Sequence, residues 1–494
     1  MSSVLAKNTL YLTVASVGQK VLAFAYFVLL ARIMGRENTG AYSLALSLVT
    51  VFQVVSDIGV TNIVIRELAK DAAGAKAIVS RALALKVPFT ILAVLIANAS
   101  TWLLDYDASI RLLVLLGSVV LAADSFSVFF YGILRGLHVL AYESLGLLMS
   151  QSLTLVAGGV ILFMHPSLPL LVIALMVGSL FNFGFSFVQV AKRLGRNILR
   201  PVFDIGAMRT LLAASIPFFL AAIFVKLYSY IDNQFIYAYL GTPMVGVYSV
   251  AYKFTYAFQF IPLAFVAALY PGMSAVVHKD PKALAHLFDR AVWYLLLIAV
   301  PISFGMFTIA DKAVALVGHG YVEAVPLLRL LTFVLIPTFL SFPVGSLLNA
   351  AGRQRTMTVI YGGTMVVNAF FDWMLIPAFG LMGAVYGSLI SITALFLAGA
   401  CFLPRIIPGY RFGPSMFIAV RILCSGAVMA VLTRWLLDRS AFGGFIGFYI
   451  ACAAVVFILM LFATRSFRRS DVADFVRLFK RPKPAYVEDA SLNG

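Results

Sequence analysis

The sequence predicts an all-α polytopic membrane protein with about fourteen transmembrane helices. Hydrophobic residues make up 62% of the 494 residues and charged residues only 12%, whereas soluble proteins carry about 25% charged residues. Apolar segments of about 20 residues, the length that crosses a bilayer, recur along the whole chain. The alternating segments of about ten residues that form membrane barrels are not found.

The apolar segments predict the helices in chain order. The first, residues 9–33, is long enough to span and lacks a small-residue cleavage site, so we expect a helix rather than a cleaved signal. We expect residues 1–200 to form a six-helix lobe, 201–405 a second six-helix lobe, 406–466 two additional helices and 467–494 a cytoplasmic tail. The helices are centred near residues 21, 52, 91, 121, 152, 179, 224, 258, 298, 336, 367, 392, 426 and 453.

Basic residues concentrate in alternate loops. With the N-terminus inside, the cytoplasmic loops and the tail contain most of them, and this bias predicts that both termini are cytoplasmic. Topology therefore accounts for most of the net charge of +17 and argues against a nucleic-acid partner. The basic tail is expected either to rest on the anionic inner leaflet as a short amphipathic helix or to remain solvated. The opposite loops contain only Arg32, Arg36, Arg111, Lys312, Arg434 and Arg439.

An internal repeat appears at an offset of 206 residues. Residues 20–53 align with residues 226–259, so each matched segment recurs six predicted helices later in the chain. Because six is an even number, the copies share one orientation and are expected to be related by an axis along the membrane normal, as in transporters that alternate access. The identities are Lys20/Lys226, Gly35/Gly241, Gly40/Gly246, Tyr42/Tyr248, Ser43/Ser249, Ala45/Ala251, Phe52/Phe258 and Gln53/Gln259.

Polar and charged residues interrupt several predicted helices. A lysine or aspartate at the centre of a membrane helix costs on the order of 2.5 to 3.5 kcal/mol, so it usually faces a cavity or a partner. Lys20 lies about 16 Å along its helix, near the midplane, and Lys226 repeats it. We expect a wet cavity lined by Lys20, Lys226, Lys253, Tyr230, Asn233, Tyr252, Tyr256, Gln259 and Arg329.

The intramembrane acids have two interpretations. Asp57, Asp232 and Asp124 are candidates for a proton or cation switch, because an acid in a low-dielectric cavity can change its charge with the access state. Alternatively, buried ion pairs such as Asp232 with Lys253 hold the helices together. The ion-pair interpretation explains single residues but not a lysine that is repeated in both lobes.

The sequence predicts no enzyme active site, metal site or cofactor. The motif "DYD" at residues 105–107 matches the carboxylate pair of metal-dependent sugar transferases, but it is short and lies in a short predicted loop. The three cysteines, Cys401, Cys424 and Cys452, lie in apolar segments without metal-type spacing, so we expect small core residues. The five histidines are scattered along the chain.

The chain also resembles a known family. "LARIMGRENTGAYSLALSLVTVFQVVSDIG", followed by "VIREL", resembles the N-terminal signature of bacterial polysaccharide flippases of the O-antigen and exopolysaccharide type, within the multidrug/oligosaccharidyl-lipid/polysaccharide exporter superfamily. "YSYIDNQFI", "GVYSVAYKF", "LYPGMS", "LLNAAGRQ" and "GLMGAVYGSLIS" resemble later signatures, to about residue 400.

The resemblance implies a V-shaped, two-lobed bundle in the bacterial inner membrane. It implies that the substrate, a polyprenyl-diphosphate-linked oligosaccharide, moves from the cytoplasmic to the outer leaflet, with a polysaccharide polymerase and chain-length machinery as partners. Lysines would meet the diphosphate and tyrosines the sugar rings. Three alternatives stay open: a peptidoglycan-precursor flippase, a multidrug or cation antiporter of the same fold, and a membrane polymerase or ligase.

Overall fold

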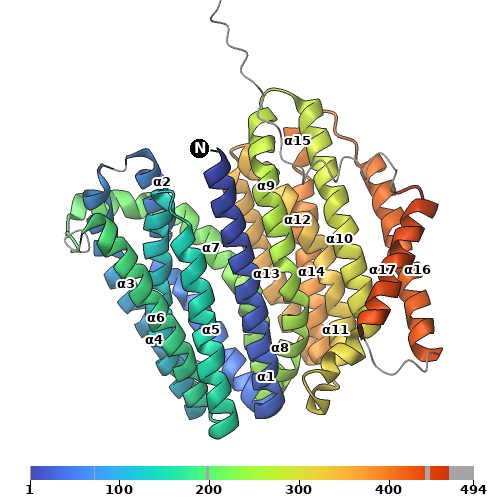
Figure 1. Ribbon diagram of the computed structural model, residues 1–494, viewed down its shortest axis with the longest axis horizontal. Coiled ribbons are helices and arrows are strands. Elements are labelled where there is room, and N and C mark those ends of the chain that lie inside the picture. The colour runs from blue at the N-terminus through green and yellow to red at the C-terminus, as the bar shows by residue number, and fades with distance from the viewer. Residues whose placement is uncertain (1, 72, 196–199, 440–445, 467–494) are drawn as a thin grey trace, which may run out of the picture.

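The computed structural model describes residues 2–71, 73–195, 200–439 and 446–466. At residues 2–13, 267–268 and 446 it describes the backbone only. The described chain is a bundle of helices that run roughly along one direction (Figure 1). The predicted tail, residues 467–494, lies outside the described residues. The longer helices of the first part are α1 (Ser2–Asp57), α2 (Val60–Lys70), α3 (Ala75–Leu103), α4 (Ala108–Gly136), α5 (Ala141–Met164) and α6 (Leu168–Leu194).

The second part repeats the pattern of long helices. It contains α7 (Ile205–Leu240), α8 (Thr242–Tyr256), η2 (Ala257–Gln259), α9 (Phe260–Val276), α10 (Pro281–Ala315), η3 (His319–Tyr321), α11 (Ala324–Leu331), η4 (Thr332–Val334), α12 (Leu335–Ala350), α13 (Gln354–Phe379), α14 (Leu381–Ala400) and α15 (Leu403–Ile406). The chain then forms α16 (Phe412–Arg439) and α17 (Ile446–Ala463). The division into lobes at residue 200 stays a prediction.

Helix α1 folds back on itself at Gly35. This glycine has φ 75° and ψ 175°, a conformation that glycine adopts without the steric strain of a side chain. Tyr26 and Tyr42 are sixteen positions apart and would lie about 24 Å apart along a straight helix, yet their ring centroids are 6.5 Å apart. Helix α1 is therefore two antiparallel arms joined by an elbow.

The second copy of the repeat has the same elbow. Gly241, which follows Gly35 by 206 residues, joins α7 to α8 with φ 82° and ψ 175°. The two elbows also pack against each other through a matched pair of glycines. A Cβ at Gly40 would overlap the Thr242 carbonyl oxygen, and a Cβ at Gly246 would overlap that of Arg36. These contacts are reciprocal at the same offset, so a pseudo-twofold relation connects the two copies.

The number of membrane spans differs from the prediction. Among the described residues, eleven helices are long and apolar enough to cross a membrane, or twelve if the bent pair Thr242–Val266 and Leu269–Val276 is one span. Fourteen spans are therefore not confirmed. The difference lies in α1, whose two arms count as one helix, and in α17, whose described apolar part, Gly447–Ala463, is shorter than the spanning helices.

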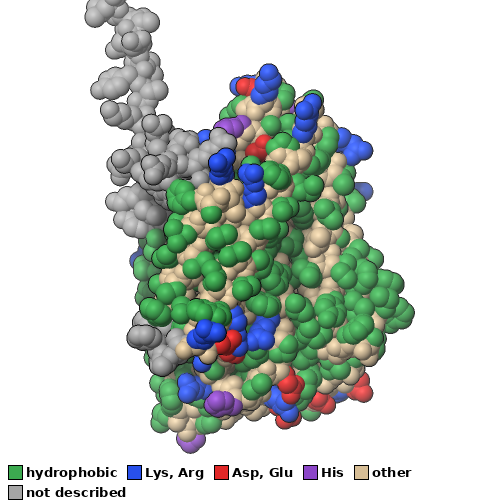
Figure 2. All heavy atoms as spheres, turned by 90° about the vertical axis from the view of Figure 1, so that its right-hand side faces the viewer, with side chains coloured by type: hydrophobic (Ala, Val, Ile, Leu, Met, Phe, Trp, Pro, Cys, Tyr) green, Lys and Arg blue, Asp and Glu red, His purple; other side chains and the backbone are tan. Residues whose placement is uncertain are grey.

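The outer surface of the bundle is apolar, as a lipid-facing surface must be. Over α16 and α17, hydrophobic side chains cover the middle of the face, and charged side chains gather toward its ends (Figure 2). Cys401 and Cys424 are exposed, and Cys452 is half-buried. The expectation of core cysteines is therefore wrong for the two exposed residues, because an apolar segment in a bilayer does not have to be buried in protein.

Candidate functional site

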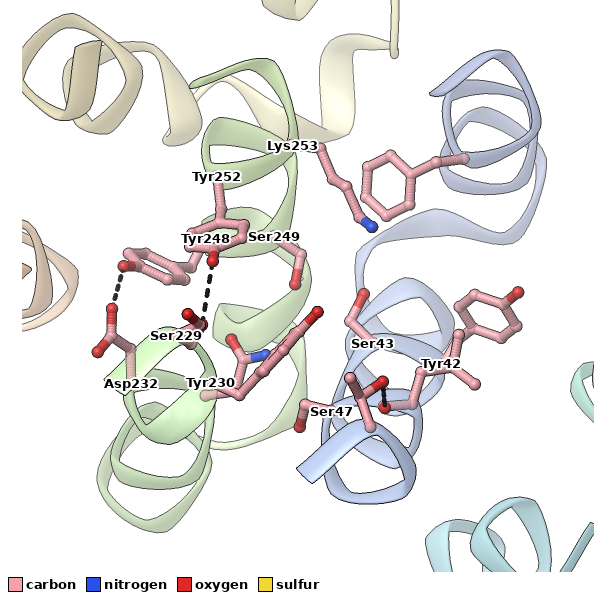
Figure 3. Close-up of a pocket in the computed structure, with 14 residues that line it drawn as sticks. Tyr42, Ser43, Ser47, Ser229, Tyr230, Asp232, Tyr248, Ser249, Tyr252 and Lys253 are labelled. Carbon is pink, nitrogen blue, oxygen red and sulfur yellow. Dashed lines mark hydrogen bonds between the residues drawn. The ribbon is translucent and has the colours of Figure 1, made fainter. Parts of the chain in front are cut away.

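A cavity of about 150 Å³ lies between the second arm of α1 and the helices α7 and α8 (Figure 3). Both copies of the repeat contribute to it, since the aligned pairs Tyr42/Tyr248 and Ser43/Ser249 line it together. We call this space the inner cavity. Its lining residues are Phe27, Tyr42, Ser43, Leu46, Ser47, Thr50, Ser229, Tyr230, Asp232, Asn233, Tyr248, Ser249, Tyr252 and Lys253.

Four of the nine predicted binding residues line the inner cavity: Tyr230, Asn233, Tyr252 and Lys253. Sequence reasoning missed the hydroxyl groups of α1 that face them. Ser43, Ser47 and Thr50 follow one another at spacings of four and three residues, which places them on one face of a helix. This spacing, together with the alignment of Ser43 with Ser249, is the signal that would have identified them.

Three lysines gather beside this cavity. The Lys253 Nζ lies 5.4 Å from the centre of the Phe27 ring, and the Lys226 Nζ lies 5.7 Å from that of Tyr230. Lys20 is close enough to both lysines to repel them electrostatically. Lys20 and Lys253 are exposed. Within the part of the chain that the structure describes, none of the three forms a salt bridge, so together they make a positively charged site suited to an anion.

The remaining predicted binding residues do not line this cavity. The Tyr256 ring stacks on that of Tyr252, with centroids 3.8 Å apart, at the end of α8. Gln259 lies in η2 and Arg329 in α11. A binding role for Tyr256, Gln259 and Arg329 stays a prediction.

The inner cavity borders a pair of facing carboxyl groups. Asp232 of α7 accepts hydrogen bonds from the Tyr248 hydroxyl at 2.5 Å and from the Ser388 hydroxyl at 2.8 Å, so its described partners differ from the suggested Lys253. The Asp372 carboxyl of α13 faces it. Each carboxyl keeps one buried oxygen without a hydrogen-bond partner among the described residues. Two such groups repel each other unless a proton or a cation lies between them.

Asp57 belongs to a separate polar cluster in the first half of the chain. Its carboxylate accepts a hydrogen bond from Lys86 of α3 at 3.0 Å, and the Lys86 side chain is fully buried. Lys86 also donates to the Ser125 hydroxyl at 2.6 Å. Lys86 was not singled out from the sequence, and its pairing with Asp57 was not predictable because the two residues are 29 positions apart. Asp124 lies beside Ser179 of α6. It is part of neither the Asp232–Asp372 pair nor the Asp57–Lys86 cluster.

The "DYD" motif is engaged by protein side chains. Asp105 pairs with Arg111 at 3.0 Å, and Asp107 accepts a hydrogen bond from the Tyr237 hydroxyl at 3.3 Å. The intervening Tyr106 is buried and stacks on Tyr237, with ring centroids 4.8 Å apart. The motif therefore joins the α3–α4 loop to α7.

Comparisons with known proteins give two family matches and several relatives. Residues 5–277 match the family model described as polysaccharide biosynthesis protein, and residues 217–374 match the MatE model. "Probable flippase AglR" of Haloferax volcanii is 25% identical over 42% of this chain and 44% of its own length. The succinoglycan biosynthesis transport protein ExoT of Rhizobium meliloti is 26% identical over 41% of each chain. The matches span less than half the length of these two relatives.

Solved structures share the fold. The lipid II flippase MurJ, in an inward closed conformation, superposes with a TM-score of 0.73 and 14% identity over 95% of this chain and 99% of its own. An inward-facing multidrug resistance MATE transporter gives 0.67 and 16% identity over 80% of this chain and 96% of its own. At these identities the likeness shows the fold alone.

Proposed function

Because the chain belongs to the polysaccharide biosynthesis protein family, we propose that it is a flippase that moves a polyprenyl-diphosphate-linked oligosaccharide from the cytoplasmic to the outer leaflet by alternating access. It is a membrane transporter rather than an enzyme. We propose further that the protein lies in the bacterial inner membrane with both termini in the cytoplasm, and that it acts together with a polysaccharide polymerase.

The observation that carries the proposal is the group of Lys20, Lys226 and Lys253 without acidic partners in the described structure. A diphosphate offers several anionic oxygens, and ammonium groups bind such oxygens as compact charges. The neighbouring tyrosines and hydroxyl groups suit the sugar that follows the diphosphate, while the lipid tail remains in the bilayer. An organic cation would be repelled by the same lysines, which disfavours multidrug export.

We assign the coupling of transport to ions, as part of the proposal, to Asp232. Its carboxyl group lines the inner cavity and faces Asp372, so uptake or loss of one cation there changes the charge next to the substrate. Asp57 is a weaker candidate, because Lys86 already neutralises it. For Asp124 the described contact is with Ser179, and this contact gives no support for a coupling role.

The test is a flipping assay with purified protein in proteoliposomes. Three lipids are compared: a lipid-linked oligosaccharide diphosphate, the lipid-linked peptidoglycan precursor, and a zwitterionic phospholipid. We expect the oligosaccharide diphosphate to flip fastest and the phospholipid to remain at the protein-free rate. Faster flipping of the peptidoglycan precursor would assign the protein to that substrate, and no flipping of either diphosphate would refute the proposal.

A further inference from the structure

The molecule is closed at the end that carries Gly35 and Gly241, which we call the elbow end. Two tyrosine contacts hold it in addition to the Gly40–Gly246 crossing. Tyr321 donates a hydrogen bond to the Ala31 carbonyl at 3.0 Å and lies 2.9 Å from the Thr39 hydroxyl, so it bridges both arms of the α1 elbow. Tyr106 of the first half reaches α7 in the same manner, just before the Gly241 elbow.

A second space opens at this end. A pocket of about 740 Å³ lies between the α3–α4 loop and the α7–α8 elbow, and we call it the outer pocket. It shares no lining residue with the inner cavity. Its lining residues are Leu104, Tyr106, Asp107, Ile231, Gln234, Phe235, Tyr237, Ala238, Gly241 and Thr242.

The side chain of Gln234 lines the outer pocket and hydrogen-bonds to a lining residue of each space. Its Nε2 donates a hydrogen bond at 3.1 Å to the hydroxyl of Ser47, which lines the inner cavity. Its Oε1 accepts a hydrogen bond from the hydroxyl of Tyr106, which lines the outer pocket. An amide carries both a donor and an acceptor, so this one side chain connects α7 to two elements of the first half, α1 and the α3–α4 loop.

We propose that Gln234 is the gate residue that closes the substrate route at the elbow end, and that the outer pocket is where the polar headgroup leaves. Separation of the halves must break both hydrogen bonds of Gln234, and neither involves a charged group. Once they break, Gln234 moves away from both Ser47 and Tyr106, and the inner cavity becomes continuous with the outer pocket. The exit role rests on the proposed function, whereas the gate role is independent of the substrate.

The gate can be tested by thiol accessibility in the full-length chain. Cys401, Cys424 and Cys452 are replaced by serine, and Ser43→Cys supplies a reporter thiol in the inner cavity. The Ser43 hydroxyl has no hydrogen-bond partner among the described residues, so this replacement disturbs little. A second variant carries Asp105→Cys instead. The Asp105 side chain is 97% exposed, so labelling of this thiol shows on which side of the membrane the elbow end lies.

A membrane-impermeant maleimide is added from the side that labels Asp105→Cys. We expect Gln234→Ala to raise the labelling rate of the Ser43→Cys reporter at least five-fold, and Tyr106→Phe, which removes one of the two bonds, to raise it less. The matched control is Asn98→Ala. The Asn98 amide also donates to a serine, Ser118 at 2.8 Å, but both residues belong to the first half, so its loss is expected to leave labelling unchanged.

Equal labelling of the parent, Gln234→Ala and Tyr106→Phe chains would overturn the gate. If Gln234→Ala does not fold, Tyr106→Phe alone decides, since it keeps the ring stack on Tyr237. An equal rise in Asn98→Ala would also contradict it, because loosening of the first half would then explain the effect. No substrate is present in this assay, so failure of the gate is distinguishable from failure of the proposed flippase activity.

Discussion

The buried pair of Lys86 and Asp57 makes a prediction about single residues. Lys86→Met is expected to lower the free energy of unfolding by on the order of 3 kcal/mol, because it leaves the Asp57 carboxylate without its cation inside the bundle. Adding Asp57→Asn is expected to restore most of the loss. Equilibrium unfolding of the two single variants and the double variant measures this coupling, and additive losses would show that the pair is not coupled.

The Asp232 carboxyl group makes a prediction about ion dependence. Asp232→Asn keeps an oxygen for Tyr248 and Ser388 but removes the negative charge. We expect transport to lose its dependence on the coupling cation while the folded yield stays close to that of the parent. Transport assays under imposed proton and sodium gradients measure this. A variant with normal transport and unchanged ion dependence would remove Asp232 from the mechanism, and the same test applies to Asp57→Asn.

Sequence reasoning found residues that stand out in their own helices. A lysine or an aspartate in an apolar segment is visible without a structure, and Lys253, Lys226 and Asp232 do lie in or beside the inner cavity. The partners of these residues were not predictable in the same way. Whether Asp232 meets Lys253, or instead Tyr248 and Ser388, depends on how α7 packs against α8 and α14, and a single sequence does not contain that packing.

At the scale of elements, the crossing of α1 and α8 depends on the absence of two side chains. Gly40→Ala places a methyl group against the Thr242 carbonyl, and the backbones must separate. We expect a loss of about 1–3 kcal/mol in the free energy of unfolding, as for overpacked cores. Gly305→Ala is the control, because a Cβ there meets no atom within 4 Å. Equal stability of the two variants would contradict the close crossing.

The repeat shows how much of these elements was predictable. Identical glycines at one offset predicted two related segments, and the structure gives Gly35 and Gly241 the same backbone conformation. The packing of the two copies against each other was not predictable, because the identities do not say which faces meet. The fourteen predicted spans are not confirmed for a related reason, since the two arms of α1, which meet at Gly35, count as a single helix.

At the scale of the whole molecule, the charge distribution predicts the orientation in the membrane. Reporter fusions near Gly195 and in the tail are expected to read cytoplasmic, and fusions near Gly318 external, because basic residues favour the cytoplasmic side. Gly318 precedes the Tyr321 contact at the elbow end, so an external reporter there also orients the gate. A cytoplasmic signal at Gly318 would invert the proposed direction of access.

The central claim is that Lys20, Lys226 and Lys253 form one binding site for the diphosphate. Removing a lysine that has no acidic partner relieves repulsion among the three, so alanine variants are expected to remain folded. Arginine variants keep the charge and are expected to keep part of the activity, because a point charge matters more than shape at this site. If the lysines instead served only to stabilise the fold, their replacement by alanine would reduce the folded yield.

The decisive measurement is the flipping rate of the oligosaccharide diphosphate per folded protein in proteoliposomes, for the alanine and arginine variants of Lys20, Lys226 and Lys253. The predicted result is a loss of at least ten-fold for each alanine variant at unchanged folded yield, with partial activity in the arginine variants. Parent-like flipping by the alanine variants, or a loss that only follows the folded yield, would contradict the claim.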